Sequence, residues 1–379
     1  MLNATYWDAS ESPEYRGFQW GKTQGDLSAD LQSDDPAGST SDTFSALLTG
    51  LESNTLYYYR AYIAVLEGGE YKYYTGEIKS FTTAKPDEGE VIDPGEGGEG
   101  GEGGDSSKGG WFELPAMNVR LTSDGYMVDA SNSDLYYAIH KADVGTRNYT
   151  VCYKGFYHCP VWVAAPRHSI YSAKVVDRSD AYRKDPNIPS GVQQASTSGS
   201  TSGYNRGHML GSAERLGSRK LNEQVFYITN IAPQNSSWFN TGGGGWNILE
   251  EFVDRFECPD TLYVVIGTYF ENYTDGYGNR ATKKSADFMG SDVQIPTAFY
   301  YAMMRTKSGS SGKSLKNCSA GEIQCAAFIR AHAQGTKGQQ VTKKEMLTID
   351  KLEELTGFDY FPNVPNAPES SMNPSDWGL

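Results

Sequence analysis

The chain has 379 residues, 38% of them hydrophobic, and a formal net charge of −14 at pH 7. This length is enough for two domains with substantial cores, and the sequence has no run of 18 apolar residues that could span a membrane. Residues 1–110 carry 20 acidic and 7 basic residues, so the totals of 47 and 33 leave 27 acidic and 26 basic residues for 111–379. The acidity therefore belongs to the amino-terminal part, and the nearly neutral remainder can still carry a local basic cleft.

Residues 1–84 are predicted to form a small β-domain. A turn and a strand rich in tyrosine and β-branched residues occupy 48–65, and a closing strand follows at 78–84. The region resembles the fibronectin type III sandwich, with Tyr57 at the tyrosine-corner position and 17–21 on an earlier strand. Little sequence precedes what resembles the second strand, so we expect a missing first strand or an atypical domain. Nothing in it indicates catalysis, which favours a role in spacing or adhesion.

Residues 85–110 are predicted to be a flexible linker. The stretch is rich in glycine and acidic residues and almost without apolar ones. Such a composition cannot offset the entropy of ordering by burial, and its like charges repel one another. We therefore expect a separate domain from residue 111 to the end of the chain.

Residues 111–379 show a mixture of strand and helix signals. A buried strand is expected at 263–268, a helix at 246–256, and a second helix at 343–356 that ends at Gly357. These elements predict an α+β domain built on a central antiparallel sheet.

A linked set of polar motifs occupies 47 residues of this region. It comprises Tyr204-Asn205-Arg206-Gly207-His208, Asn230-Ile231-Ala232-Pro233-Gln234, Asn240, and Trp246-Asn247-Ile248-Leu249-Glu250. A lone Arg-Gly-His is more often a turn with a satisfied histidine. Together with its partners, however, the motif predicts a site that cleaves phosphodiesters.

The residue types match that chemistry. Hydrolysis of a phosphodiester near neutral pH requires a base for water and a cation for the developing charge. His208 is the candidate base, because imidazole alone has an unperturbed pKa that suits this task. Arg206 offers a planar fork to phosphate oxygens, and the amide oxygen of Asn240 is a suitable hard ligand for Mg²⁺, which keeps several of its waters.

The pattern resembles the DNA/RNA non-specific endonucleases of the ββα-metal (His-Me finger) group, which includes sugar-non-specific bacterial nucleases and mitochondrial endonuclease G. The family signature is Asp-Arg-Gly-His, then Asn-x-x-Pro-Gln about 22 residues later, then a metal-binding Asn and Trp-x-x-Leu-Glu. Here His208 and Asn230 are 22 residues apart. Two departures occur: Asn205 replaces the aspartate, and the glycines at 242–245 lengthen the segment between Asn240 and Trp246. With its flanking segments the resemblance covers residues 111–379.

The resemblance also implies further site residues. Glu250 matches a glutamate that the family uses to hold water beside the metal, with Glu251 as its rival because the glycines blur the register. Arg255 resembles a phosphate-contacting arginine, and Arg178 is a weaker candidate for the same role. Two more residues are expected either to contact substrate or to serve only as turn residues, and these are Asn230 and Gln234. For the other four histidines, surface or core roles are expected: His140, His158, His168 and His332.

The sequence thus predicts a ββα-metal finger nuclease that depends on Mg²⁺, with Mn²⁺ as a possible substitute. Its expected partners are DNA and RNA, cleaved with little sequence preference to leave 5′-phosphates. Two alternatives stay open: a catalytically decayed nuclease fold that acts in binding or adhesion, and a phosphodiesterase for another substrate. The oligomeric state is open, a homodimer being one option.

The cysteines and the domain organisation bear on the cellular compartment in which the protein is expected. Cys152 with Cys159 and Cys318 with Cys325 have spacings that could close short disulfide loops, which would leave Cys258 over. Five reduced, buried cysteines are an equal alternative. A fibronectin-like module tethered to a nuclease favours an exported bacterial protein, either secreted, periplasmic or associated with the cell envelope, although no signal peptide is present.

Overall fold

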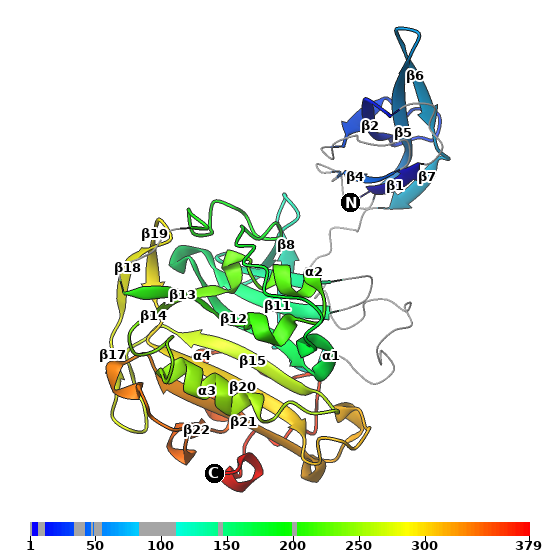
Figure 1. Ribbon diagram of the computed structural model, residues 1–379. Helices are drawn as coiled ribbons and strands as arrows, with labels where there is room; N and C mark the ends of the chain where they lie inside the picture. The colour runs from blue at the N-terminus through cyan, green and yellow to red at the C-terminus, as the bar shows by residue number, and fades with distance from the viewer. Residues whose placement is uncertain are drawn as a thin grey trace. The chain divides into compact units, whose positions relative to one another are not determined.

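The computed structural model describes residues 2–6, 12–33, 42–46, 48, 55–82, 111–142, 147–198 and 203–379. The chain divides into two compact units, one of Met1–Glu90 with Ser123–Gly125 and one of Val91–Thr122 with Tyr126–Leu379 (Figure 1). The predicted linker at 85–110 lies outside the described residues, as does most of the predicted turn at 48–54, so both stay predictions.

The smaller unit consists of antiparallel β-strands. One sheet pairs β1 (Leu2–Tyr6) with β4 (Asp42–Ala46). The other has the order β3 (Ala29–Gln32), β2 (Tyr15–Gly21), β5 (Leu56–Glu67) and β6 (Glu70–Thr75), and β7 (Lys79–Thr82) also pairs with β5. Phe18 and Phe44 are buried with ring centroids 5.3 Å apart, and buried Tyr57 stacks on Phe81. In its described residues the unit is therefore all-β as expected, while its likeness to a fibronectin type III domain stays a prediction.

A nine-stranded sheet forms the framework of the larger unit, and all its neighbouring strands pair antiparallel. Its order is β22 (Met346–Leu347), β21 (Ile323–Ala331), β20 (Ala298–Thr306), β15 (Leu262–Tyr269), β12 (Cys159–Arg167), β11 (Arg147–Lys154), β10 (Leu135–Lys141), β9 (Met127–Asp129) and β8 (Val119–Leu121). The predicted strand at 263–268 lies in β15, and the central antiparallel sheet is confirmed.

Other parts of the chain pack on both faces of this sheet. Neighbouring side chains of one strand contact both sides, because they point alternately to the two faces. On β20, Phe299 and Tyr301 pack on Trp246 of α3 (Gly245–Asp254), with ring centroids 5.3 and 5.2 Å away. Tyr300 points to the other face, where its hydroxyl lies 2.8 Å from that of Tyr360. The helix predicted at 246–256 is thus α3, and it covers one face of the sheet (Figure 1).

Two short strands precede α3 and pair outside the large sheet. These are β13 (Tyr204–His208) and β14 (Ile231–Asn235), which form an antiparallel pair that we call the finger hairpin. Between them lie a 3₁₀ turn at Ser212–Arg215, α2 (Arg219–Gln224) and a 3₁₀ turn at Ile228–Asn230. The order strand, strand, helix is the ββα arrangement that the resemblance implies.

The remaining elements are short. They comprise α1 (Ser169–Ser172), a hairpin of β16 (Tyr273–Thr274) with β17 (Arg280–Ala281), a hairpin of β18 (Lys284–Phe288) with β19 (Ser291–Ile295), and α4 (Ile349–Thr356). Among the described residues no helix is both long and apolar enough to cross a membrane.

The helix predicted at 343–356 is wrong in its first half. Residues 343–345 form a 3₁₀ turn capped by Thr342, residues 346–347 pair with β21 as β22, and α4 begins only at Ile349, after its cap Thr348. A ladder to β21 overrides the helical pattern there. The end of the helix at Gly357, in the left-handed region with φ of 77°, is as predicted.

All five cysteines are free thiols in the structure, and four of them are buried. The side chain of Cys258 is partly exposed. The choice between paired and reduced cysteines stays a prediction.

Candidate active site

The finger hairpin places His208 opposite Ile231 and Arg206 opposite Pro233. Between them Gly207 pairs with Ala232, and its lack of a side chain is required by packing. A Cβ atom at this position would lie 2.2 Å from Cδ of Gln234, whose side chain is fully buried across the hairpin. The glycine of the Arg-Gly-His motif thus makes room for the glutamine of the second motif.

Aromatic rings flank the imidazole of His208. Phe226 meets it edge-on with centroids 4.8 Å apart, and the Tyr182 ring lies 5.8 Å away. The residue as a whole is partly exposed, but Nε2 is buried and has no hydrogen-bond partner among the described residues. Burial lowers the pKa of His208 to about 3, and the positive charges of Arg178 and Arg206 act in the same direction. The imidazole is therefore neutral at pH 7.

The same two rings hold the two predicted arginines. The guanidinium of Arg206 lies 3.7 Å from the Tyr182 ring centroid, and its Nη1 donates to the Thr197 carbonyl at 3.0 Å. The guanidinium of Arg178 lies 4.7 Å from the Phe226 centroid and donates to Asp180 at 2.7 Å. Stacking on an aromatic face leaves the edge of a guanidinium open to an anion. The structure thus brings His208, Arg206 and Arg178 together around one aromatic pair.

A chain of amides joins the hairpin to the segment that follows it. Asn240 Nδ2 donates to Gln234 Oε1 at 2.7 Å, and Gln234 Nε2 lies 3.4 Å from the carbonyl of His208. Asn205 Nδ2 donates to the Asn240 carbonyl at 2.7 Å. An ionised aspartate only accepts hydrogen bonds and could not make this last contact. The replacement of aspartate by Asn205 therefore ties the hairpin to the lengthened segment.

Asn240 and Asn235 differ in what their amide oxygens do. Asn235 Oδ1 accepts from the backbone N–H groups of Ser237 and Trp238 at 2.9 and 3.3 Å, as a turn residue does. Asn240 Oδ1 accepts no hydrogen bond among the described residues, while its Nδ2 is held by Gln234. Of the two asparagines, only Asn240 offers a fixed and free amide oxygen.

Asn230 is completely buried, and its side chain bonds only to the backbone. Its Oδ1 accepts from the Leu210 N–H at 3.0 Å, and its Nδ2 donates to the carbonyls of Leu210 and Val225. These bonds fix the chain directly after His208. A direct contact of Asn230 or Gln234 with substrate stays a prediction, and both amides are engaged inside the protein here.

Glu250 and Arg255 lie on and just after α3. Burial and the neighbouring Glu214 carboxylate raise the pKa of Glu250 well above its usual range. Arg255 is exposed and stacks on Phe252, 4.5 Å from the ring centroid. Neither side chain bonds to or stacks on His208 in the described part of the chain. Glu251, the rival of Glu250, is exposed.

The residues fit a metal that needs few protein ligands. Among the described residues no group of three or more His, Cys, Asp or Glu side chains could hold an ion. A single neutral oxygen from Asn240 suits Mg²⁺, which prefers hard oxygen ligands and keeps most of its waters. A thiolate or imidazole cage for a softer metal does not occur among them.

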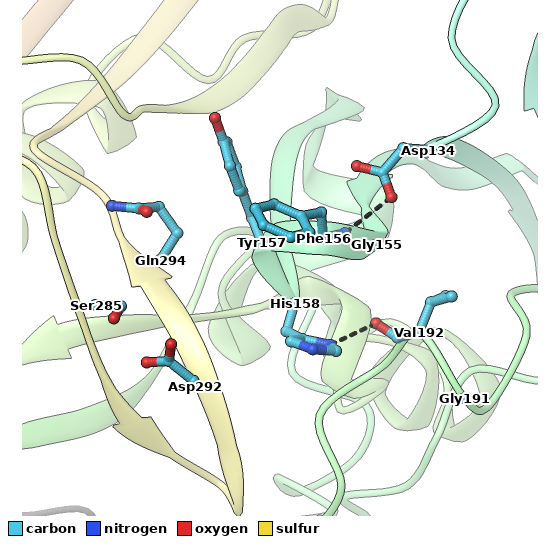
Figure 2. Close-up of a pocket in the computed structure, with 10 residues that line it drawn as sticks. All are labelled: Asp134, Gly155, Phe156, Tyr157, His158, Gly191, Val192, Ser285, Asp292 and Gln294. Carbon is cyan, nitrogen blue, oxygen red and sulfur yellow. Dashed lines mark hydrogen bonds between the residues drawn. The ribbon is translucent and has the colours of Figure 1, made fainter.

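An open pocket of about 610 Å³ lies apart from these residues. Figure 2 shows its lining side chains, which include Phe156, Tyr157 and His158 on one side and Asp292 and Gln294 of β19 on another. None of the predicted site residues lines it.

Sequence reasoning missed Tyr182, Phe226 and Thr197. The only sequence signal was the four-residue spacing between Arg178 and Tyr182. Phe226 gave no such signal, because it comes from a separate segment near the end of α2. Their role depends on three chain segments that meet only in the fold.

Comparison with known proteins identifies the family of the larger unit. The sequence profile of the DNA/RNA non-specific endonucleases matches residues 134–367. The chain belongs to this family. The matched region does not include the amino-terminal β-unit.

The similar proteins include nucleases from several organisms. A mitochondrial nuclease EXOG from Homo sapiens is 27% identical over 226 residues, which cover 57% of this chain and 56% of that protein. A nuclease from Nostoc sp. is 27% identical over 254 residues, covering 66% and 79%. The chain thus spans little more than half the length of the mitochondrial EXOG protein. A solved structure of endonuclease G in a complex with its inhibitor is 20% identical to this chain, with a TM-score of 0.45. The match covers 59% of this chain and 85% of the endonuclease G chain.

Proposed function

We propose that this protein is a metal-dependent endonuclease that hydrolyses the phosphodiester bonds of DNA and RNA with little sequence preference. One observation carries the proposal. The finger hairpin joins a neutral His208, whose Nε2 has no partner among the described residues, to two stacked arginines and, through Gln234, to the free amide oxygen of Asn240.

His208 acts as the general base. Its neutral imidazole can accept a proton from water as the water attacks phosphorus. A base with a pKa of about 3 is weak in the free protein. A bound phosphate brings negative charge next to the ring and raises that pKa, so the imidazole gains basicity when substrate arrives.

Arg206 and Arg178 bind the phosphate. Their stacked guanidinium planes present N–H groups in a fixed direction. Arg206 uses one nitrogen for the Thr197 carbonyl, which holds it in place and leaves the others available. The proposed role of Arg255, which has no acidic partner among the described residues, is a further phosphate contact at the end of α3.

Asn240 would hold the metal through Oδ1, and Gln234 keeps that oxygen oriented. Mg²⁺, or Mn²⁺ in its place, supplies positive charge that neutralises the charge developing on the phosphate. Glu250 is proposed to hold a water molecule next to this position. Asn230 fixes the chain beside His208, which is a positioning role.

A direct test is to incubate the full chain with plasmid DNA, ribosomal RNA and a small aryl phosphodiester, each with Mg²⁺ and with EDTA. We expect Mg²⁺-dependent cleavage of both nucleic acids. Cleavage of the small ester alone would favour the phosphodiesterase alternative, and no cleavage of any of them would favour a decayed nuclease fold.

Export from a bacterial cell belongs to the same proposal, and fractionation of cells that express the full-length protein tests it.

A further inference from the structure

We propose that residues 330–338, here called the support segment, fix the loop that carries the metal ligand, and that His332 is a positioning residue for Asn240. The loop, residues 235–245, is called the finger loop. The inference rests on the proposed function and adds to it the elements that set metal affinity.

His332 holds the beginning of the finger loop. Its Nε2 accepts from the backbone N–H of Asn235 at 2.9 Å, and its Nδ1 bonds to the Pro296 carbonyl at 2.9 Å. A carbonyl only accepts, so the ring proton lies on Nδ1 and leaves Nε2 as the acceptor. The side chain is buried, and it packs 4.4 Å from the ring of Phe239, the residue directly before Asn240. The sequence had predicted only a core or surface role for this histidine.

Arg330 holds the end of the finger loop. Its Nη1 donates to the Gly245 carbonyl at 2.8 Å, where α3 begins. Its other nitrogens form a buried pair with Glu345, at 2.5 and 2.8 Å. The carboxylate thus neutralises the arginine and fixes its fork, so the contact with Gly245 has a set direction.

The glycine-rich middle of the loop is also attached. The N–H of Gly338 donates to the Gly243 carbonyl at 2.8 Å, and Lys337 Nζ donates to the Ser237 carbonyl at 2.9 Å. Gly245 packs so closely on Thr336 that a Cβ atom would lie 2.3 Å from Oγ1. The glycine run is therefore attached to the support segment, and at Gly245 the lack of a side chain permits the close approach.

A short path of bonds leads from His332 to the metal ligand. The Asn235 carbonyl accepts from the N–H of Asn240 at 2.8 Å, and the Asn235 N–H is the group that His332 holds. Loss of the imidazole would leave a partly buried N–H without its partner and allow Asn235 to tilt. The Asn240 amide would then move, while His208 on β13 and the rings of Tyr182 and Phe226 beside it would stay in place.

The experiment compares His332→Ala with His158→Ala in the full chain. His158 is a matched control, because its Nδ1 also bonds to a backbone carbonyl, that of Val192 at 2.8 Å. Among the described residues it makes no hydrogen bond or ring contact with the finger loop. Two quantities are measured: Mn²⁺ binding without substrate, by electron paramagnetic resonance, and plasmid cleavage against metal concentration.

We expect His332→Ala to weaken Mn²⁺ binding by about 10-fold to 100-fold, the usual effect of losing a group that orients a metal ligand. At saturating metal the cleavage rate should recover to within about threefold of wild type, because the base is untouched. His158→Ala should bind Mn²⁺ as wild type does. Equal effects of the two substitutions, or an unchanged Mn²⁺ affinity in His332→Ala, would overturn the inference.

A milder pair of variants covers the case in which His332→Ala does not fold. Lys337→Ala removes one bond to the loop from an exposed side chain, and Lys351→Ala removes an exposed lysine of α4 that pairs only with Glu354. Lys337→Ala alone should weaken Mn²⁺ binding, by about threefold. Mn²⁺ binding without cleavage would refute the proposed function but not this inference, and absence of Mn²⁺ binding by the wild type would refute the inference itself.

Discussion

The two halves of the site are held by different physics. The half around His208 is set by burial and aromatic packing, with Tyr182 and Phe226 flanking the ring and carrying the arginines. The half around Asn240 is set by directional hydrogen bonds: Asn240 Nδ2 donates to Gln234, and Asn205 donates to the Asn240 carbonyl. Packing adjusts the pKa of a base, whereas directed amide bonds fix the position of one oxygen. Substitutions in the first half should therefore change chemistry at every metal concentration, and those in the second half should change metal dependence.

The largest effect is expected from His208→Ala. Removal of a positioned general base should lower the turnover number by about 10² to 10⁴-fold. The fold should remain, because the ring makes no hydrogen bond through Nε2. Single-turnover cleavage at saturating Mg²⁺ measures the effect, with circular dichroism as the check on folding. A rate like that of wild type would remove His208 from the mechanism.

Asn240→Ala and Asn235→Ala test the metal half. Loss of the free amide oxygen of Asn240 should raise the apparent Mg²⁺ constant by about 10-fold to 100-fold, so the defect should be greater at low Mg²⁺. Asn235→Ala removes the acceptor of a turn and should lower the rate equally at every Mg²⁺ concentration. Titration of the cleavage rate with Mg²⁺ separates the two. If Asn235 were the metal-sensitive residue, the assignment of Asn240 would be wrong and that of His208 would stand.

Acid should weaken the fold through two buried histidines, one in each half of the site. Burial lowers the pKa of His208 and of His332 to about 3. Between about pH 6.5 and this value the unfolded chain binds a proton at each histidine and the folded chain does not. The free energy of unfolding should therefore decrease as the pH is lowered through this range, by about 1.4 kcal/mol per pH unit for each histidine.

Urea unfolding at pH 7 and at pH 5 measures this slope in wild type and in His332→Gln. The raised pKa values of Glu214 and Glu250 act in the opposite direction, since those carboxyls bind protons more readily when folded. The comparison with His332→Gln cancels their contribution. An identical pH dependence in the two proteins would show that His332 is not neutral by burial.

The smallest effect is expected from deletion of residues 1–110. The site residues all belong to the larger unit, and a linker of the predicted composition cannot hold a precise geometry between domains. The shortened protein should keep its fold and its cleavage rate. A folded but inactive product would mean that the amino-terminal part also shapes the site, in addition to the halves around His208 and Asn240.

Much of the framework was predictable because it depends on local patterns. The apolar run in β15 and the amphipathic helix α3 lie where the sequence placed them. The Asn-x-x-Pro-Gln motif, which the sequence singled out by its spacing, lies on the strand that pairs with Arg-Gly-His. The start of α4 could not be predicted, because a ladder from β22 to β21, which lies in a separate part of the sequence, competes with the helical pattern. The same is true of Phe226 and His332, which reach the site through tertiary contacts and carry no signal in their spacing.

Nicking of a supercoiled plasmid tests the central claim most directly. Wild type and His208→Ala are compared in excess Mg²⁺ and in EDTA, at equal protein concentration. The account predicts nicking by wild type in Mg²⁺, a loss of at least about 100-fold in His208→Ala, and no nicking by either protein in EDTA. Equal nicking by wild type with and without the metal, or by both proteins in Mg²⁺, would contradict it.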